Sequence, residues 1–244
     1  MIKNQLIKKH FYTVIYVAKT LIELKQVLKY YQMGETIVKA VDGIDIKIEE
    51  GDFVAIMGPS GSGKSTVMNL VGSLDLPTKG DIILDGKNIS YLDESQLSEV
   101  RGKKIGFIFQ SFNLIQNLTA KENIMLPMLF QEINEEERHK KAEDLIKMVE
   151  LCDRIDHKPN QLSGGQQQRV AIARALSNNP DIILADEPTG NLDTKTGEKV
   201  IEFLKDLNNK GKTIIIVTHD PEVASHARII FMVKDGKVEK VTKK

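Results

Sequence analysis

The chain has 244 residues, and its 34 Lys and Arg balance its 34 Asp and Glu, so the formal net charge is zero. An apolar content of 41% is too high for a chain that is disordered throughout. Zero net charge argues against a general nucleic-acid coat, although a local basic patch could survive this average, and we expect no nucleic-acid partner. The single cysteine, Cys152, excludes an internal disulfide and fits a reducing compartment.

The N-terminal residues 1–20 resemble the start of a secretory signal without completing one. Three early lysines precede the apolar stretch Phe11–Ala18, but Lys19 ends that stretch and no small-residue cleavage pattern follows. We therefore expect residues 1–20 to be a weakly ordered, non-secreted extension, which an upstream start codon would explain. A weak amphipathic contact with a membrane is the alternative.

The pattern of the remaining chain predicts strands that alternate with helices. Period-2 alternation and short apolar runs predict strands, and Asp85-Gly86 and Asp235-Gly236 predict tight turns between strands. Strands are expected at Leu21–Val27, Gly43–Ile48, Phe53–Met57, Asp81–Leu84, Ile105–Phe109, Asp181–Ala185 and Thr213–Val217, and helices at Ser65–Val71, Ser163–Arg174 and Thr194–Leu207. This order predicts an α/β fold with a mainly parallel sheet.

The middle of the chain predicts two further helices. Thr119 with Glu122 and Asn134 with Glu137 have the spacing of capping boxes. Pro127 is expected to break the first of these helices. On the second, an apolar stripe is expected to face the core, formed by Ala142, Leu145, Ile146 and Val149.

A glycine-rich loop with the pattern G-x-x-x-x-G-K-S lies between a predicted strand and a predicted helix. Its residues are Gly58, Pro59, Ser60, Gly61, Ser62, Gly63, Lys64 and Ser65. Glycines let the backbone fold its N–H groups around phosphate oxygens, and the helix N-terminus adds partial positive charge. Lys64 is placed to reach the β- and γ-phosphates, and the Ser65 hydroxyl to bind Mg²⁺. The loop therefore predicts a nucleoside triphosphate site.

Two carboxylates follow the apolar strand at Ile182–Ala185. Ligand sites of parallel sheets form at the carboxyl ends of the strands. Asp186 is therefore expected to hold Mg²⁺, through water, and Glu187 to orient the attacking water or act as its base near the γ-phosphate.

A second glycine motif, Leu162-Ser163-Gly164-Gly165-Gln166, opens a predicted helix. Ser163 is expected to cap that helix, whose free N–H groups would face an anion as those of the phosphate loop do. The two helix ends flank the predicted helical region and are not expected to converge within one chain. Two copies related by a two-fold axis would bring each Ser163 motif to the other copy's phosphate loop.

Together these motifs resemble the ATP-binding subunit of an ABC transporter, over about residues 21–240. Further matches are the Q-loop glutamine Gln110, the D-loop Asn191-Leu192-Asp193, the switch histidine His219 and the adenine-stacking Tyr31. Within the family, the segments 31–34, 72–75 and 161–169 are similar to the lipoprotein-release, macrolide-efflux, antimicrobial-peptide-resistance and cell-division ATPases. The resemblance implies a P-loop NTPase (RecA-like) parallel-sheet core with an antiparallel β lobe, over 21–112 and 161–244. It also implies a helical subdomain over 113–160.

The resemblance also implies roles for single residues. The residues expected to contact ATP are Tyr31, Gly58, Pro59, Ser60, Gly61, Ser62, Gly63, Lys64, Ser65, Thr66, Gln110, Ser163, Gly164, Gly165, Gln166, Asp193 and His219. Catalysis is assigned to Lys64, Gln110, Glu187 and His219, and Mg²⁺ binding to Ser65, Gln110 and Asp186. Tyr31, and not the neighbouring Tyr30, is expected to stack on adenine.

The implied partners are a second copy in the ATP-bound state and a separate membrane permease, with the protein peripheral on the cytoplasmic face of the cell membrane. A soluble or cell-division ATPase that acts on a non-transport partner is the alternative. The residues considered for a permease groove, with core packing as an equal alternative, are Phe112, Leu114, Ile115, Leu126 and Met128. The charged runs 135–137 and 140–141 are expected to be a solvated helix face.

Overall fold

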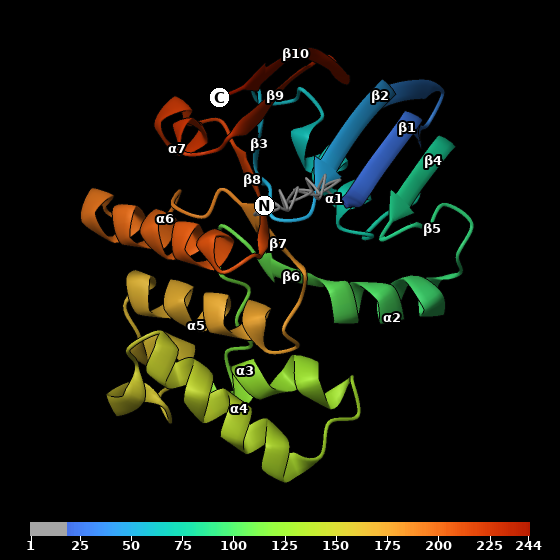
Figure 1. Ribbon diagram of the computed structural model, residues 1–244. Helices are drawn as coiled ribbons and strands as arrows, with labels where there is room; N and C mark the ends of the chain where they lie inside the picture. The colour runs from blue at the N-terminus through green and yellow to red at the C-terminus, as the bar shows by residue number, and fades with distance from the viewer. Residues whose placement is uncertain (1–18) are drawn as a thin grey trace, which may run out of the picture.

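The computed structural model describes residues 19–244, so most of the expected N-terminal extension lies outside the described residues. Its centre is a six-stranded sheet in the order β10-β9-β3-β8-β7-β6 (Figure 1). The strands are β3 (Phe53–Met57), β6 (Ile105–Ile108), β7 (Ile182–Asp186), β8 (Thr213–Thr218), β9 (Ile229–Lys234) and β10 (Lys237–Lys243). All neighbours pair in parallel except β10, which runs antiparallel to β9. The predicted parallel core is confirmed.

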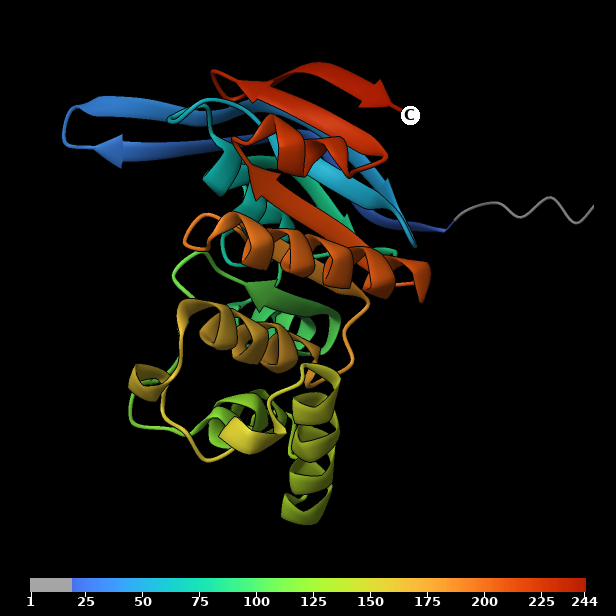
Figure 2. The same cartoon turned by 90° about the vertical axis from the view of Figure 1, so that its left-hand side faces the viewer.

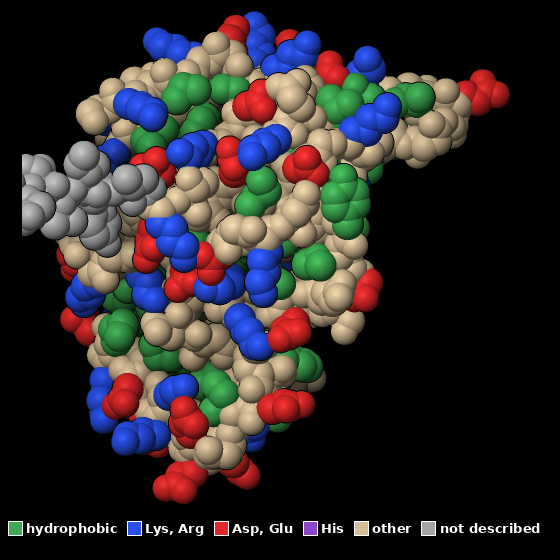
Figure 3. Space-filling view, turned by 45° about the vertical axis from the view of Figure 1, so that its right-hand side comes forward, with side chains coloured by type: hydrophobic (Ala, Val, Ile, Leu, Met, Phe, Trp, Pro, Cys, Tyr) green, Lys and Arg blue, Asp and Glu red, His purple; other side chains and the backbone are tan. Residues whose placement is uncertain are grey.

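A second, antiparallel sheet forms the β lobe, in the order β2-β1-β4-β5. Its strands are β1 (Thr20–Met33), β2 (Thr36–Glu49), β4 (Lys79–Leu84) and β5 (Lys87–Asn88). Strands β1 and β2 continue past the sheet as a long hairpin that projects from the body of the protein (Figure 2). Apolar side chains lie exposed along this hairpin, at Met33, Ile37 and Val38 (Figure 3).

Seven α-helices surround the two sheets within the described part of the chain. They are α1 (Lys64–Val71), α2 (Glu94–Lys104), α3 (Ala120–Leu129), α4 (Glu135–Met148), α5 (Gly164–Leu176), α6 (Thr194–Asn209) and α7 (Pro221–Ser225). None of the helices in residues 19–244 combines the length and the apolar character that a membrane crossing requires. Two short 3-10 turns, Cys152–Arg154 and Pro159–Gln161, connect α4 to α5, and the Cys152 thiol on the first of them is exposed.

Two hydrophobic clusters hold these layers together. The first lies between the β lobe, α1 and one face of the parallel sheet, where Val67, Leu70 and Leu184 are buried. The second joins the other face of that sheet to α3, α4, α5 and α6, through residues such as Ile124 and Leu204. The apolar face of the helical region is therefore continuous with the main core.

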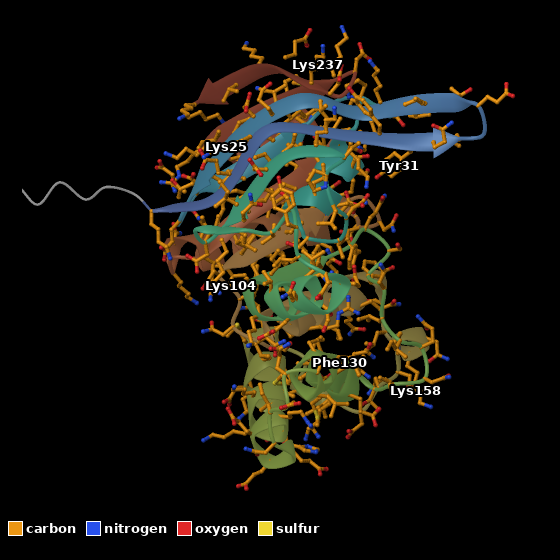
Figure 4. The ribbon with its side chains drawn as sticks, turned by 90° about the vertical axis from the view of Figure 1, so that its right-hand side faces the viewer. Lys25, Tyr31, Lys104, Phe130, Lys158 and Lys237 are labelled. Carbon is orange, nitrogen blue, oxygen red and sulfur yellow. The ribbon has the colours of Figure 1, made fainter. Side chains whose placement is uncertain are left out.

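Lys104, at the end of α2, ties the β lobe to the parallel core (Figure 4). Its ammonium group lies 2.9 Å from the Asp85 carboxylate in the turn between β4 and β5, and 2.7 Å from the Asp181 carboxylate before β7. Hydrogen bonds with these two carboxylates raise the pKa of Lys104, and the bond with Asp181 has the larger effect. The amine therefore stays charged throughout the physiological range.

Two expectations for the helical region are wrong. Pro127 does not break α3, which continues to Leu129. The proline lies in the last turn, where one backbone hydrogen bond is lost, and burial of Ile124 and Met128 keeps the turn in place. Asn134 caps α4 through the Glu137 N–H, but the Glu137 carboxylate contacts the Asn134 amide instead of its backbone, so no full capping box forms.

Candidate active site

The phosphate loop leaves the carboxyl end of β3 and enters α1. Gly63 caps α1 with a φ of 100°, and a Cβ there would lie 2.3 Å from the Ala40 carbonyl oxygen. A Cβ at Gly58 would lie 2.1 Å from the Val233 carbonyl oxygen. Glycine is therefore required at both positions, by backbone conformation and by close approach. No side chain in the described part of the chain caps α1, so its first N–H groups face the loop.

The loop is held by the β9–β10 turn, because the Gly236 N–H donates to the Ser62 carbonyl at 2.9 Å. The Lys64 ammonium group donates to the Pro59 carbonyl at 3.0 Å, across the mouth of the loop. The Ser62 hydroxyl is buried and has no partner among the described residues. The loop thus presents a cation and free N–H groups, while the Ser62 hydroxyl lies buried and does not line the cavity.

Asp186 and Glu187 end β7 in different surroundings. Burial, followed by the charge of Glu187, raises the pKa of Asp186, while the Lys64 charge acts in the opposite direction. The Asp186 carboxylate accepts no hydrogen bond from the described residues. A carboxylate that is shielded from water and accepts no hydrogen bond is suited to bind a cation.

Glu187 is fixed by residues at the end of β8, the strand next to β7 in the sheet. Its carboxylate accepts hydrogen bonds from the Thr218 hydroxyl at 3.0 Å and from the His219 N–H at 3.0 Å. The His219 Nδ1 lies 2.6 Å from the same carboxylate. Because a carboxylate only accepts, Nδ1 carries the proton and Nε2 points away from Glu187. Glu187 has a φ of 44°, a left-handed conformation that is rare for a residue with a side chain.

These segments enclose one cavity of about 630 Å³. The predicted site residues that line it come from the phosphate loop, the end of β6, the end of β7 and the end of β8: Gly58, Pro59, Ser60, Lys64, Gln110, Glu187 and His219. Met57 and Met232 complete the wall. They are register partners, Met57 at the end of β3 and Met232 within β9, and no local signal in the sequence marks them.

Gln110 is placed by the segment that follows Glu187. The Asn191 side-chain amide donates to the Gln110 backbone carbonyl at 2.9 Å. A Cβ at Gly190 would lie 2.7 Å from the Gln110 side-chain nitrogen, so the absence of a side chain at 190 makes room for the glutamine. Asp193, in contrast, caps α6 through the Thr196 N–H and does not line the cavity.

Tyr31 lies on the projecting hairpin, outside the cavity (Figure 4). Its hydroxyl donates to the Asp75 carboxylate at 2.8 Å, and the Lys29 ammonium group lies 5.1 Å from its ring centroid. Burial and then the Asp75 hydrogen bond raise the pKa of Tyr31. Tyr30 instead donates to Asp42, so the neighbouring tyrosines have different surroundings.

The Ser163 motif forms the expected cap of α5. The Ser163 hydroxyl accepts from the Gln166 N–H at 3.3 Å, and the Gln166 side chain accepts from the Ser163 N–H at 2.8 Å. A Cβ at Gly165 would lie 2.6 Å from the Thr196 methyl group. None of the motif's residues lines the cavity of the same chain.

A phosphate loop, an acidic strand end and a glutamate–histidine pair, gathered at the carboxyl edge of a parallel sheet, define a P-loop nucleoside triphosphatase. The family model for ABC transporters matches residues 41–190. The chain belongs to the ABC transporter family.

The chain is similar to several relatives over most of its length. It is 55% identical to the uncharacterised ABC transporter ATP-binding protein MJ0796 of Methanocaldococcus jannaschii, over 91% of this chain and 97% of that protein. It is 50% identical to the macrolide export ATP-binding/permease protein MacB of Bdellovibrio bacteriovorus, over 90% of this chain but only 33% of MacB. The dimeric post-hydrolysis structure of MJ0796 bound to ADP and Pi superposes with a TM-score of 0.85 at 54% identity, covering 91% of this chain and 98% of that one.

These findings confirm the resemblance, including the macrolide-efflux subgroup, and the expected fold. The protein is an ATP-binding and ATP-hydrolysing subunit of an ABC transporter.

Proposed function

We propose that two copies of this chain close around two ATP molecules and thereby drive a separate permease at the cytoplasmic face of the cell membrane. One observation carries the proposal. The phosphate loop and the Glu187–His219 pair share a cavity, whereas the capped Ser163 motif lies outside the cavity of its own chain. A second copy would supply the missing helix end.

In this proposal the loop residues from Gly58 to Thr66 bind the phosphates through backbone N–H groups and the Lys64 ammonium group. Tyr31 stacks on adenine, and the partner copy's signature residues Ser163 to Gln166 close over the γ-phosphate, with Asp193 near the interface. The Glu187 carboxylate orients the attacking water and accepts its proton. The Nε2 of His219 contacts the γ-phosphate, while Nδ1 keeps the ring on Glu187.

Mg²⁺ fits the residues present. Asp186 offers a carboxylate without a donor, Ser65 a hydroxyl, and Gln110 an amide, although of the three only Gln110 lines the cavity. Mg²⁺ is commonly held by one or two carboxylates together with substrate phosphates. Within residues 19–244, no group of three or more His, Cys, Asp or Glu forms a metal site of its own. The ion would offset phosphate charge when bound, and these residues would orient the phosphates around it.

A groove of about 740 Å³ between the helical region and the core is our candidate for the site that binds the permease. It is lined by α2, the end of α3 and the end of α5, with Phe130 (75% exposed) and Leu74 (41% exposed) presenting apolar surface (Figure 4). Of the earlier candidates, Leu114 and Met128 are buried in the core, whereas Ile115 is exposed. An amphipathic helix of the permease would place its apolar face on Phe130.

The test measures ATPase activity and ATP-dependent assembly of the purified chain. We expect wild-type protein to hydrolyse ATP with Mg²⁺, and Glu187→Gln to elute as a dimer with ATP and as a monomer with ADP in light scattering. A Glu187→Gln protein that stays monomeric at saturating ATP would contradict the shared site. Co-purification of the tagged chain from membranes, lost in Phe130→Asp, would support the groove. Recovery with a soluble partner alone would favour the non-transport alternative.

A further inference from the structure

Arg174 joins the last part of α5 to the turn that follows Gln110. Its Nη2 donates to the Phe112 carbonyl at 2.8 Å, and its Nη1 donates to the Asn113 carbonyl. Burial lowers the pKa of the guanidinium group, and no carboxylate forms an ion pair with it in residues 19–244. The charge of this partly buried arginine is therefore met by the two backbone carbonyls.

The turn that Arg174 holds is strained. Phe112 and Asn113 have φ values of 60° and 50°, two consecutive residues with side chains in the left-handed region. The left-handed region is disfavoured for residues with a side chain, less so for Asn than for Phe, and the conformation persists where the surroundings impose it. Within residues 19–244, the Phe112 and Asn113 N–H groups bond only inside the turn, to Phe109 and Ser111. From outside the turn, Arg174 bonds both carbonyls, and the Phe112 side chain packs against the hydrophobic core.

Gln110 lies between this restraint and another. On one side the Asn191 amide holds its backbone carbonyl at 2.9 Å, and two residues further on the Arg174 contacts begin. The Phe112 ring also lies 3.8 Å from where a Cβ of Gly164 would stand, at the first turn of α5. The turn after Gln110 is thus hydrogen-bonded to the last part of α5 and lies near the first turn of the same helix.

We propose that Arg174 is a positioning residue for hydrolysis, which fixes the turn of residues 110–113 to α5 so that Gln110 and the signature helix are set together. The proposal rests on the proposed function, because it uses the shared site and the role given there to Gln110. Arg174 and Asn113 also line the groove assigned to the permease. A helix entering the groove would meet this contact directly.

Arg174→Gln tests the proposal. We expect equilibrium ATP affinity to stay within about twofold of wild type, because the phosphate loop is untouched. We expect kcat to fall about tenfold or more and the half-saturating Mg²⁺ concentration to rise several-fold, because Gln110 is no longer held. Simple loss of folded protein would lower kcat without changing the Mg²⁺ concentration for half-saturation.

Hydrogen–deuterium exchange provides a readout that does not depend on activity. In nucleotide-free Arg174→Gln, we expect faster exchange in peptides that cover residues 109–114, and unchanged exchange in peptides that cover β7. Unchanged exchange in residues 109–114 would show that another contact holds the turn.

Arg138 provides the matched control. Its Nη1 donates to the Ile133 carbonyl at 3.0 Å, the same kind of contact, at the start of α4 and away from the nucleotide cavity. Arg138→Gln should leave kcat and Mg²⁺ half-saturation unchanged. Arg174→Lys keeps the charge but bridges the two carbonyls less well, so it should restore part of kcat and also gives a second variant if Arg174→Gln folds poorly.

A double mutant separates action through Gln110 from an independent effect. If Arg174 acts through Gln110, Gln110→Ala combined with Arg174→Gln should lose no more kcat than Gln110→Ala alone. The inference would be overturned if the kcat loss of the double variant equalled the product of the two single losses. It would also be overturned if both Arg174 variants kept the wild-type kcat and the wild-type response to Mg²⁺. Failure of the proposed function would look different, because the wild-type chain itself would then lack ATPase activity or ATP-dependent assembly.

Discussion

Glu187 and Lys64 face the same cavity but are held in different ways. Three contacts from Thr218 and His219 fix the Glu187 carboxylate, whereas the Lys64 ammonium group, among the described residues, donates only to the Pro59 carbonyl of its own loop. The glutamate is preset for one geometry, and the lysine can leave its contact for a phosphate. Substitutions at the two positions should therefore fail at different steps.

We predict that Lys64→Ala weakens ATP binding about tenfold or more, because a charge-assisted phosphate contact is lost. Glu187→Gln keeps the shape of the side chain but not its basicity. It should bind ATP as wild type does and lose about 100-fold or more in kcat. Equilibrium binding and single-turnover hydrolysis measure the two effects, and equal ATP affinity in both variants would contradict the assignment.

The ionised Asp186 is expected to destabilise the folded protein, whereas an ionised aspartate usually stabilises it. Burial and the Glu187 charge raise its pKa, so its contribution to folding is fully present only below the ordinary pKa near 3.8 and is lost as the pH rises through the folded-state pKa. Asp186→Asn cannot ionise. It should raise the Tm of the nucleotide-free protein at pH 7.5 by about 1–4 °C, with a smaller gain at pH 4.5.

Asp85 provides the contrasting control in the same thermal scans. Hydrogen bonds from Lys19 and Lys104 lower its pKa, so its contribution is present above the ordinary pKa and is lost as the pH falls through the folded-state pKa. Asp85→Asn should lower the Tm at pH 7.5. A lower Tm in Asp186→Asn would show that the Asp186 charge stabilises the apo protein after all.

At the scale of elements, β1 places its neighbouring tyrosines against different carboxylates, Asp75 for Tyr31 and Asp42 for Tyr30. Stacking of a base on an aromatic ring is worth about 1–3 kcal/mol. We predict that Tyr31→Ala raises the ATP dissociation constant about tenfold, and that Tyr30→Ala leaves it nearly unchanged. Tyr31→Phe, which keeps the ring and loses the Asp75 contact, should fall between them. A larger effect at Tyr30 would reverse the assignment.

Elements with strong local signals are predictable from the sequence. The buried strand β3 matches its predicted bounds, and the capping box at Thr119 and the helix cap at Ser163 form as expected. Helix α2 has no predicted counterpart because only Leu97 is buried on it, so it lacks an apolar stripe. Its capping box of Asp93 and Gln96 is the signal that could have found it.

The candidate site divides in the same way. Phosphate-loop glycines, Asp186 and Glu187 can be read from the sequence because each follows an apolar strand. The Arg174 contacts and the strain at Phe112 and Asn113 cannot, because they depend on α5 packing against a turn about 60 residues earlier in the chain. Strand β1 also extends beyond its predicted end, since the pairing of residues 28–33 with β2 is set by the Gly34 turn and not by alternation.

At the scale of the whole molecule, the separation of the Ser163 motif from the phosphate loop predicts complementation between two disabled proteins. Lys64→Ala and Ser163→Arg should each be nearly inactive alone. A mixed dimer has one site with both lesions and one with neither, so mixing should restore about a quarter of wild-type activity when half of the dimers are mixed and each intact site acts alone. No recovery, although both variants fold and light scattering detects mixed dimers, would show that each site lies within one chain.

The exposed thiol of Cys152 gives every copy of the protein one native labelling point, on the turn after α4 and away from the nucleotide cavity. A nitroxide attached there needs no engineered cysteine and no removal of others, because the sequence contains a single cysteine. Pulsed electron–electron double resonance on frozen samples would then report one distance between the two nitroxides of each dimer. A narrow distance distribution that appears with ATP and disappears with ADP would follow the two helical regions through a working cycle in the unmodified catalytic sequence.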